Sequence, residues 1–147
     1  MKRPWILAII VIVVLCIIFI PKLISNEGDA QVKFSAVDKN DIPKKLKEAL
    51  PNYLQQERAL ACRMNEDIYV VVTRGEKNTG GYSVTIDKIE KVSKDDDFGL
   101  IVYAKYKDPK PDEVVPQVIT YPYTVVKTNL KELPKNIKLE VEYNQPK

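Results

Sequence analysis

The sequence predicts a mainly β fold: a small antiparallel β-sandwich or partly open barrel of about five strands, with a short helical lead-in and one N-terminal transmembrane helix. Three observations lead to this expectation. An uncharged apolar run lies close to the N-terminus, a short stretch with helical spacing follows it, and from Asp67 onward β-branched and aromatic residues alternate with polar ones. The chain therefore divides into a membrane segment and one compact domain.

The N-terminal apolar run extends from Trp5 to Ile20 and reads WILAIIVIVVLCIIFI, with Pro4 and Pro21 on either side. A transmembrane helix needs about 20 residues, and at least about 17. The run reaches this range if the apolar residues beyond Lys22 are included and the lysine amine extends to the interface. Because backbone groups in lipid must be hydrogen-bonded within the segment, a helix is the form we expect. Residues 1–25 are therefore predicted to be a transmembrane signal-anchor in contact with membrane lipid.

Two other interpretations of the N-terminus remain open. A cleaved signal peptide needs small residues at its cleavage site, and Gly28-Asp29-Ala30 has that spacing but lies far beyond the apolar run. A lipoprotein would use Cys16, but Leu15 precedes it and the apolar run continues after it. Lys2 and Arg3 before the helix favour a cytoplasmic N-terminus. We therefore expect a single-pass cell-membrane protein whose domain is extracytoplasmic.

After the membrane segment we expect a polar linker over residues 26–40 and one domain over residues 41–147. The domain begins with a helical lead-in, for which Asp41 is a candidate N-cap and Pro43 suits the first turn. A second short helix is expected from Asn52 to Ala61. Apolar residues at this spacing predict helices that pack one face against a sheet.

Five segments of the domain have the composition and alternation of strands. Pro122 lies inside the fourth segment. Because proline donates no ladder hydrogen bond, we expect that strand to lie at a sheet edge or to be kinked there. Polar, glycine-containing or proline-rich stretches separate the segments and are typical of loops. The segments are residues 68–73, 82–86, 100–106, 118–127 and 137–143.

Composition argues against several kinds of chemistry. Histidine is absent, which removes the commonest general base and the commonest zinc ligand. Cys16 and Cys62 are expected on different sides of the membrane boundary and therefore unpaired, with Cys62 a small buried residue. The net charge is only +3, and positive and negative residues are intermixed along the chain. We therefore expect no nucleic-acid binding. We also predict no cofactor and no metal site, because Asp95 to Asp97 lack the spacing of a known calcium loop.

Carboxylates are plentiful, among them Glu76 and Asp87, and the sequence does not fix their separation in space. A glycosidase-like acid pair therefore remains open. No motif supports catalysis, however, and a domain of about 115 residues offers little room for a substrate cleft. We expect that the protein is not an enzyme.

The most informative stretch is the loop from Gly75 to Val84, which reads GEKNTGGYSV. Its paired glycines permit positive φ angles and let another chain approach the backbone closely, and Tyr82 stands at the entrance of the next strand. The stretch lacks the glycine-lysine-hydroxyl end of a phosphate-binding loop and opens no helix, so nucleotide binding is not indicated. By itself it is typical of a β-hairpin or bulge loop. The later Thr120-Tyr121-Pro122-Tyr123 stretch is by itself typical of an edge-strand kink.

Taken together and in this order, GEKNTGGYSVTI and QVITYPYTVV resemble the C-terminal domain of PrcB-type protease-complex subunits. The resemblance covers about half of the chain, from Tyr69 to Lys127. It implies a membrane-associated accessory protein that binds and stabilises a surface protease, although the namesake is lipid-anchored and this chain lacks a lipobox. The resemblance implies no catalytic role. The positions that match the family's motif are candidate partner-binding residues: Thr79, Gly80, Gly81, Tyr82, Tyr121, Pro122 and Tyr123.

The loop from Asn78 to Tyr82 is also similar to the threonine-glycine-tyrosine loop of chagasin-like cysteine-protease inhibitors, which are β-sandwiches. Two functions follow as expectations. The first is a membrane-anchored extracytoplasmic accessory or binding module, which binds or stabilises a surface protease or another envelope protein. The alternative is a protease inhibitor that acts through the Gly80-Gly81-Tyr82 loop. An inhibition assay against a panel of proteases separates the two.

Overall fold

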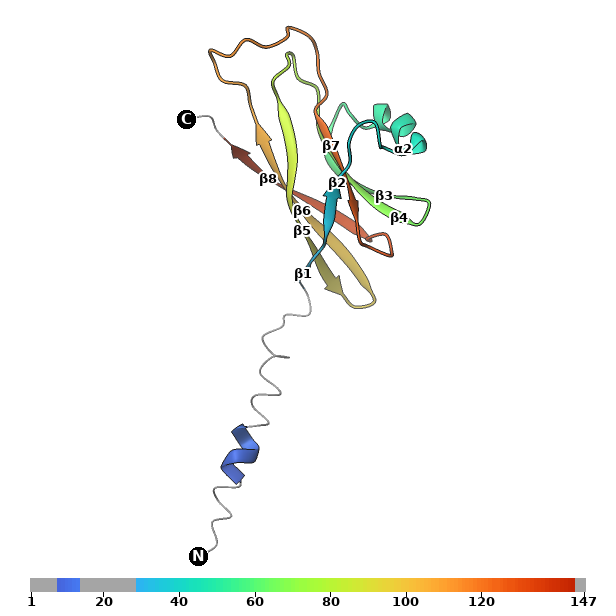
Figure 1. Ribbon diagram of the computed structural model, residues 1–147, viewed down its shortest axis with the longest axis vertical. Coiled ribbons are helices and arrows are strands. Elements are labelled where there is room, and N and C mark those ends of the chain that lie inside the picture. Colours follow the sequence, from blue (N-terminus) through green and yellow to red (C-terminus); the bar gives the residue numbers. More distant parts are fainter. Residues whose placement is uncertain (1–7, 14–28, 145–147) are drawn as a thin grey trace, which may run out of the picture.

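The structure, a computed structural model, describes residues 8–13 and 29–144 of the chain. Residues 29–144 form eight strands in two four-stranded sheets, with one short α-helix and one 3-10 helix (Figure 1). The prediction of a mainly β fold is thus confirmed, although the domain has more strands than the sequence indicates.

Residues 8–13 are helical and exposed. In the described part of the chain, no helix is long and apolar enough to cross a membrane. Most of the predicted membrane segment, Trp5 to Ile20, lies outside the described residues, so the signal-anchor stays a prediction.

The first sheet has the strand order β1-β5-β6-β8. β1 (Asp29–Gln31) and β6 (Asp97–Lys107) both lie antiparallel to β5 (Ser83–Lys94), and β5 and β6 form a long hairpin. β8 (Asn136–Asn144) runs parallel to β6 at the edge, which corrects the expectation of purely antiparallel strands. Parallel pairing requires a crossover connection, and here the chain passes through the second sheet between β6 and β8.

The second sheet has the order β2-β7-β4-β3, with all neighbours antiparallel. β2 (Phe34–Ala36) and β4 (Asp67–Arg74) lie on either side of β7 (Tyr123–Thr128), and β3 (Glu57–Met64) forms the far edge. Pro122 precedes the first residue of β7, so the ladder does not need its missing N–H. β7 is therefore an interior strand that begins after the proline, which corrects the expected edge strand.

Two strands lie in the segment expected to be a linker. β1 and β2 follow one another through Val32, where the chain passes from the first sheet to the second. The Val32 N–H donates to the Ile89 carbonyl at 2.8 Å, and the Asn129 N–H donates to the Lys33 carbonyl at 3.0 Å. The Val32 side chain is 5% exposed and belongs to the core. Residues 29–36 are therefore part of the β domain.

Two apolar clusters stabilise the domain. The larger lies between the sheets and takes side chains from both. The smaller lies on the other face of the second sheet, beneath α2 (Lys44–Ala49) and η1 (Leu50–Asn52), and contains Leu46 and Val71. The helical lead-in thus packs on a sheet, as expected. β4 is buried on both faces, which explains its nearly continuous run of β-branched residues.

The second helix expected from Asn52 to Ala61 is wrong over much of its length. From Glu57 onward the chain forms β3, which pairs with β4 along its whole length. The alanines and arginines of this segment favour a helix when the segment is considered alone, but such preferences amount to only about 0.5 kcal/mol per residue or less. Pairing with a buried neighbouring strand outweighs them.

Candidate functional site

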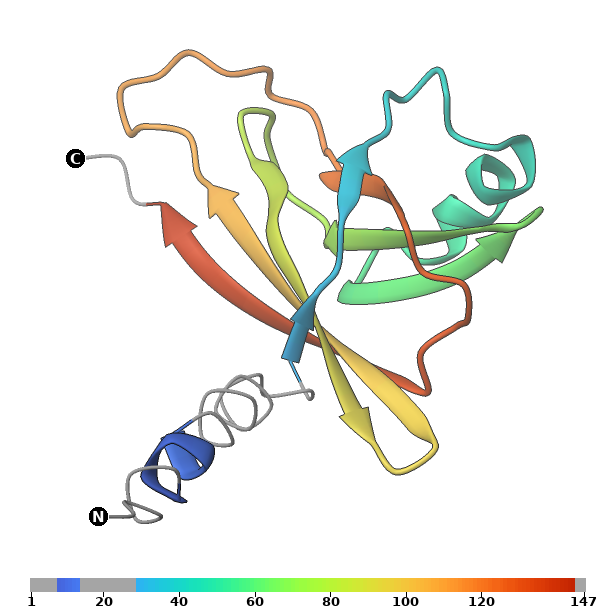
Figure 2. The same cartoon turned by 60° about the horizontal axis from the view of Figure 1, so that its bottom comes forward.

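The two distinctive sequence stretches meet at one end of the domain. The glycine loop, residues 75–82, connects β4 to β5, and the long loop, residues 108–122, connects β6 to β7. Ser83 and Lys107 are partners in the β5–β6 ladder, so the loops leave the sheet beside one another. Figures 1 and 2 both show the two loops adjacent, at the end opposite to the β5–β6 turn. We call these two loops together the loop end.

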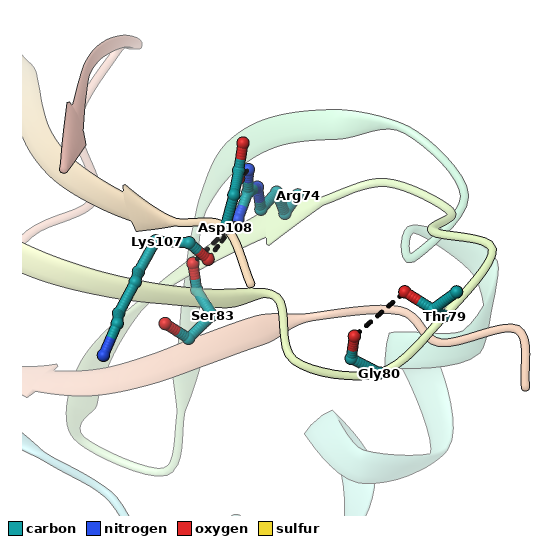
Figure 3. A network of polar contacts seen from close by, with 6 residues as sticks. All are labelled: Arg74, Thr79, Gly80, Ser83, Lys107 and Asp108. Atoms are coloured by element: carbon teal, nitrogen blue, oxygen red, sulfur yellow. Dashed lines mark hydrogen bonds and ion pairs between the residues drawn. The ribbon is translucent and has the colours of Figure 1, made fainter. Parts of the chain in front are cut away.

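Hydrogen bonds join the two loops into one unit. Lys77 and Thr120 form an isolated antiparallel bridge with N–H to oxygen contacts of 2.8 and 2.9 Å between donor and acceptor. The Gly80 N–H donates to the Pro116 carbonyl at 2.8 Å, and the Thr120 hydroxyl donates to the Thr79 carbonyl at 2.7 Å. Within the glycine loop, the Thr79 hydroxyl donates to the Gly80 carbonyl at 3.0 Å (Figure 3). The loop-to-loop contacts fix the glycine loop against the long loop.

This packing requires both glycines. A Cβ on Gly80 would lie 2.9 Å from Cδ of Pro116. Gly81 has a φ of +91°, and a Cβ there would lie 2.7 Å from Cγ1 of Val115 and 2.8 Å from Cβ of Pro109. Such separations are too short for real atoms, and a positive φ of this size strains side-chain-bearing residues. The paired glycines permit a close approach to their backbone, and the long loop of the same chain is what approaches them.

A buried arginine lies beneath the two loops. Arg74 is the last residue of β4 and is 3% exposed. Its Nη1 donates to the carbonyl oxygens of Ser83 at 3.2 Å and Lys107 at 2.9 Å. Its Nη2 forms an ion pair with the carboxylate of Asp108 (Figure 3). The sequence gives no signal for this residue, because its partners are mostly backbone oxygens from distant segments.

Three tyrosine rings surround the Arg74 guanidinium. Its central carbon lies 4.6 Å from the ring centre of Tyr106, 5.1 Å from that of Tyr82 and 5.9 Å from that of Tyr143. Cation–π contacts are stronger when the cation is withdrawn from water. Tyr106 is fully buried, and this burial raises the pKa of its hydroxyl. Tyr82, a predicted site residue, is half-buried, and its ring contacts the arginine.

The tyrosine-proline-tyrosine stretch is divided between two environments. The Tyr121 hydroxyl donates to Oε2 of Glu76 at 3.1 Å, and this hydrogen bond raises the pKa of Tyr121. The Pro122 carbonyl accepts from the Arg74 N–H at 2.9 Å. Tyr123 belongs to β7 and packs against the apolar cluster beneath α2. The structure therefore brings the first two residues to the loop end with the glycine loop, but not the third.

Sequence reasoning misses three exposed aliphatic side chains on the long loop. Val114 is 99% exposed, Val118 57% and Ile119 58%. The sequence suggests a strand from Val118 onward, because that residue begins a run rich in β-branched residues. A usable signal is present nonetheless: aliphatic residues lie within a loop whose backbone is restricted by Pro109, Pro111 and Pro116.

The described residues show no cluster of metal-ligating side chains and one half-buried thiol. Among residues 8–13 and 29–144, no group of three or more His, Cys, Asp or Glu side chains is arranged to hold a metal ion. Cys62 is half-buried on β3, and burial raises the pKa of its thiol, which reduces the thiolate available at neutral pH. What the loop end presents is loop backbone, tyrosine hydroxyls and exposed aliphatic side chains.

The fold and the loop end define a class of protein: a small β domain in which two loops at one end are hydrogen-bonded to each other. Residues 68–129 match the family described as PrcB C-terminal. The matched segment extends from β4 to the end of β7 and contains both loops. This match supports a PrcB-type C-terminal domain in the chain, whereas the similarity to chagasin-like inhibitors is not confirmed. No curated protein and no solved structure matches the chain.

Proposed function

We propose that the protein is a membrane-anchored extracytoplasmic accessory module, which binds a protein partner through the loop end and performs no catalysis itself. A surface protease is the partner that the PrcB-type domain suggests, and another envelope protein is the alternative. The observation that carries the proposal is the exposure of Val114, Val118 and Ile119 on a loop that the rest of the domain holds in place.

Exposed aliphatic side chains on a restrained loop are suited to protein recognition. Clusters of exposed apolar surface often mark interfaces. The prolines and the bridge between Lys77 and Thr120 limit the conformations of the long loop, so less conformational entropy is lost when a partner binds. Burying a valine or isoleucine side chain contributes about 1.5–3 kcal/mol before the costs of association are subtracted.

Strand addition to β6, where the long loop begins, is not the mode of contact that we expect. β6 is paired with β5 on one side and with β8 on the other up to Lys107, so it has no free edge at the loop end. An added strand needs a free row of N–H and C=O groups. Contact through the long loop is therefore expected to depend on its side chains and its backbone.

The position of the loop end suits an anchored protein. β1 pairs Asp29 with Val92, close to the β5–β6 turn, whereas the glycine loop joins β5 at Ser83. The strand between Val92 and Ser83 spans about 30 Å. An N-terminal anchor would therefore enter the domain at one end and leave the loop end on the far side, accessible to a partner.

A capture experiment in intact cells of the native host tests the proposal. A membrane-impermeant cross-linker reaches the full-length protein and its partner only if the domain is extracytoplasmic. The combined variant Val114→Ser/Val118→Ser/Ile119→Ser is expected to lower capture about tenfold or more, because interface energy concentrates in a few apolar anchors. Leu133→Ser is the matched control: it also removes an exposed aliphatic side chain, but outside both loops, and capture should not change.

Undiminished capture by the folded triple variant would contradict contact through the long loop. If the purified protein instead inhibits proteases in a panel, the inhibitor alternative through Gly80-Gly81-Tyr82 replaces the accessory function. That alternative has weaker structural support, because Gly80 is buried and a Cβ there would contact Pro116.

A further inference from the structure

We propose that Arg74 is the positioning residue of the loop end: it holds the glycine loop and the long loop in the one arrangement that presents the exposed aliphatic side chains. The statement about presentation to a partner rests on the proposed function. The statement that Arg74 fixes the two loops does not, and it can be tested without a partner.

Arg74 stands at one of the four points at which the two loops leave the sheets, and it contacts the other three. It directly precedes the glycine loop, and its Nη1 bonds to the carbonyl of Ser83, the residue after that loop. The same nitrogen bonds to the Lys107 carbonyl and Nη2 pairs with Asp108, where the long loop begins. Its backbone N–H donates to the carbonyl of Pro122, where the long loop ends. Its side chain and its backbone thus connect both loops to the ends of the strands.

The chemistry of the contact requires an arginine. A buried charge is unfavourable unless it is paired, and here the Asp108 carboxylate and two carbonyl oxygens supply the pairing. The planar guanidinium presents several N–H donors in fixed directions, whereas a lysine ammonium is a compact charge on a flexible stem. Arg74→Lys therefore keeps the charge but cannot reproduce the forked contact to both loops.

Hydrogen exchange of the full-length protein in detergent micelles measures the effect directly. The amides of Lys77, Gly80 and Thr120 report on the loop-to-loop contacts, since each donates across the gap between the loops. In Arg74→Lys these amides are expected to exchange about tenfold faster, because hydrogen bonds to a charged group are lost at the base of both loops. Amides in the middle of β4 and β6 should keep their exchange rates.

Two further variants keep the test decisive. Arg58→Lys is the matched control, since it makes the same substitution on the neighbouring strand, where the Arg58 side chain donates to Gln56 and lies over the Tyr53 ring, both in the preceding segment and outside the two loops. Asp108→Asn removes the negative charge that pairs with Arg74 at a half-exposed position, and about threefold faster exchange of the same loop amides is expected. If Arg74→Lys fails to fold, Asp108→Asn alone decides the question.

Unchanged loop exchange in the folded Arg74→Lys and Asp108→Asn variants would overturn the proposal, as would acceleration spread evenly over the whole domain. Loop-specific acceleration supports it. Partner capture then separates the two claims: reduced capture by Asp108→Asn supports the link to binding. Faster loop exchange with unchanged capture would contradict the proposed contact surface while leaving the positioning role of Arg74 in place.

Discussion

Replacing Gly81 by valine is expected to lower the free energy of unfolding by about 3 kcal/mol. Gly81 has a φ of +91°, and a left-handed backbone costs an ordinary L-residue about 1–2 kcal/mol. The new side chain would also overlap Val115 and Pro109, and overpacking of this kind costs about 1–3 kcal/mol. Urea denaturation of the full-length protein in detergent, followed by far-ultraviolet circular dichroism, measures the change.

Thr85→Val is the matched control for this substitution. It introduces the same side chain at an exposed position on β5, where valine suits the strand, so stability should stay within about 0.5 kcal/mol. If Gly81→Val proved as stable as the wild type, the glycine loop could not be packed against the long loop as described. The result thus tests the geometry of the loop end without reference to any partner.

Replacing Val32 by aspartate is expected to destabilise the domain by about 3 kcal/mol or more. Val32 is 5% exposed and lies in the core where the chain passes between the sheets. An aspartate there would be withdrawn from water and placed among the side chains of an apolar cluster. Thermal unfolding and limited proteolysis of the full-length protein both report the loss.

Ser35→Asp provides the comparison on the same short segment. Ser35 is exposed on β2 and lies opposite Lys127, so the new carboxylate meets a favourable neighbour. We expect stability close to that of the wild type. If Val32→Asp were equally harmless, residues 29–36 would be the linker that the sequence suggests and not part of the β domain.

Local patterns predict the parts of the fold that depend on local chemistry. Alternation correctly indicates the β5–β6 hairpin, and helical spacing around Leu46 correctly indicates the helix beneath the second sheet. β3 is missed because its sequence favours a helix when it is considered alone, and its pairing with β4 becomes apparent only in three dimensions. β1 and β2 are missed because three residues are too few to show alternation.

The residues of the candidate site also differ in how far the sequence alone reveals them. Gly80 and Gly81 attract attention because a glycine pair before a strand is conspicuous in a sequence, although their packing against Pro116 and Pro109 is not apparent there. Arg74 cannot be found, because its significance comes from carbonyl oxygens that lie far away along the chain. Val118 is assigned to a strand because β-branched residues have the same appearance in a strand and in an exposed loop.

We propose that the loop end, and no other face of the described domain, contacts the partner. Photo-cross-linking from single positions in living cells of the native host tests it most directly. A photoreactive phenylalanine analogue would be placed in turn at position 118 on the long loop, at position 133 outside the loop end, and at position 138 on β8, all of them exposed. We expect a discrete cross-linked protein from position 118 and none from positions 133 and 138. Cross-links from position 138 or 133 with none from position 118 would contradict contact through the loop end and place the contact surface on another part of the domain.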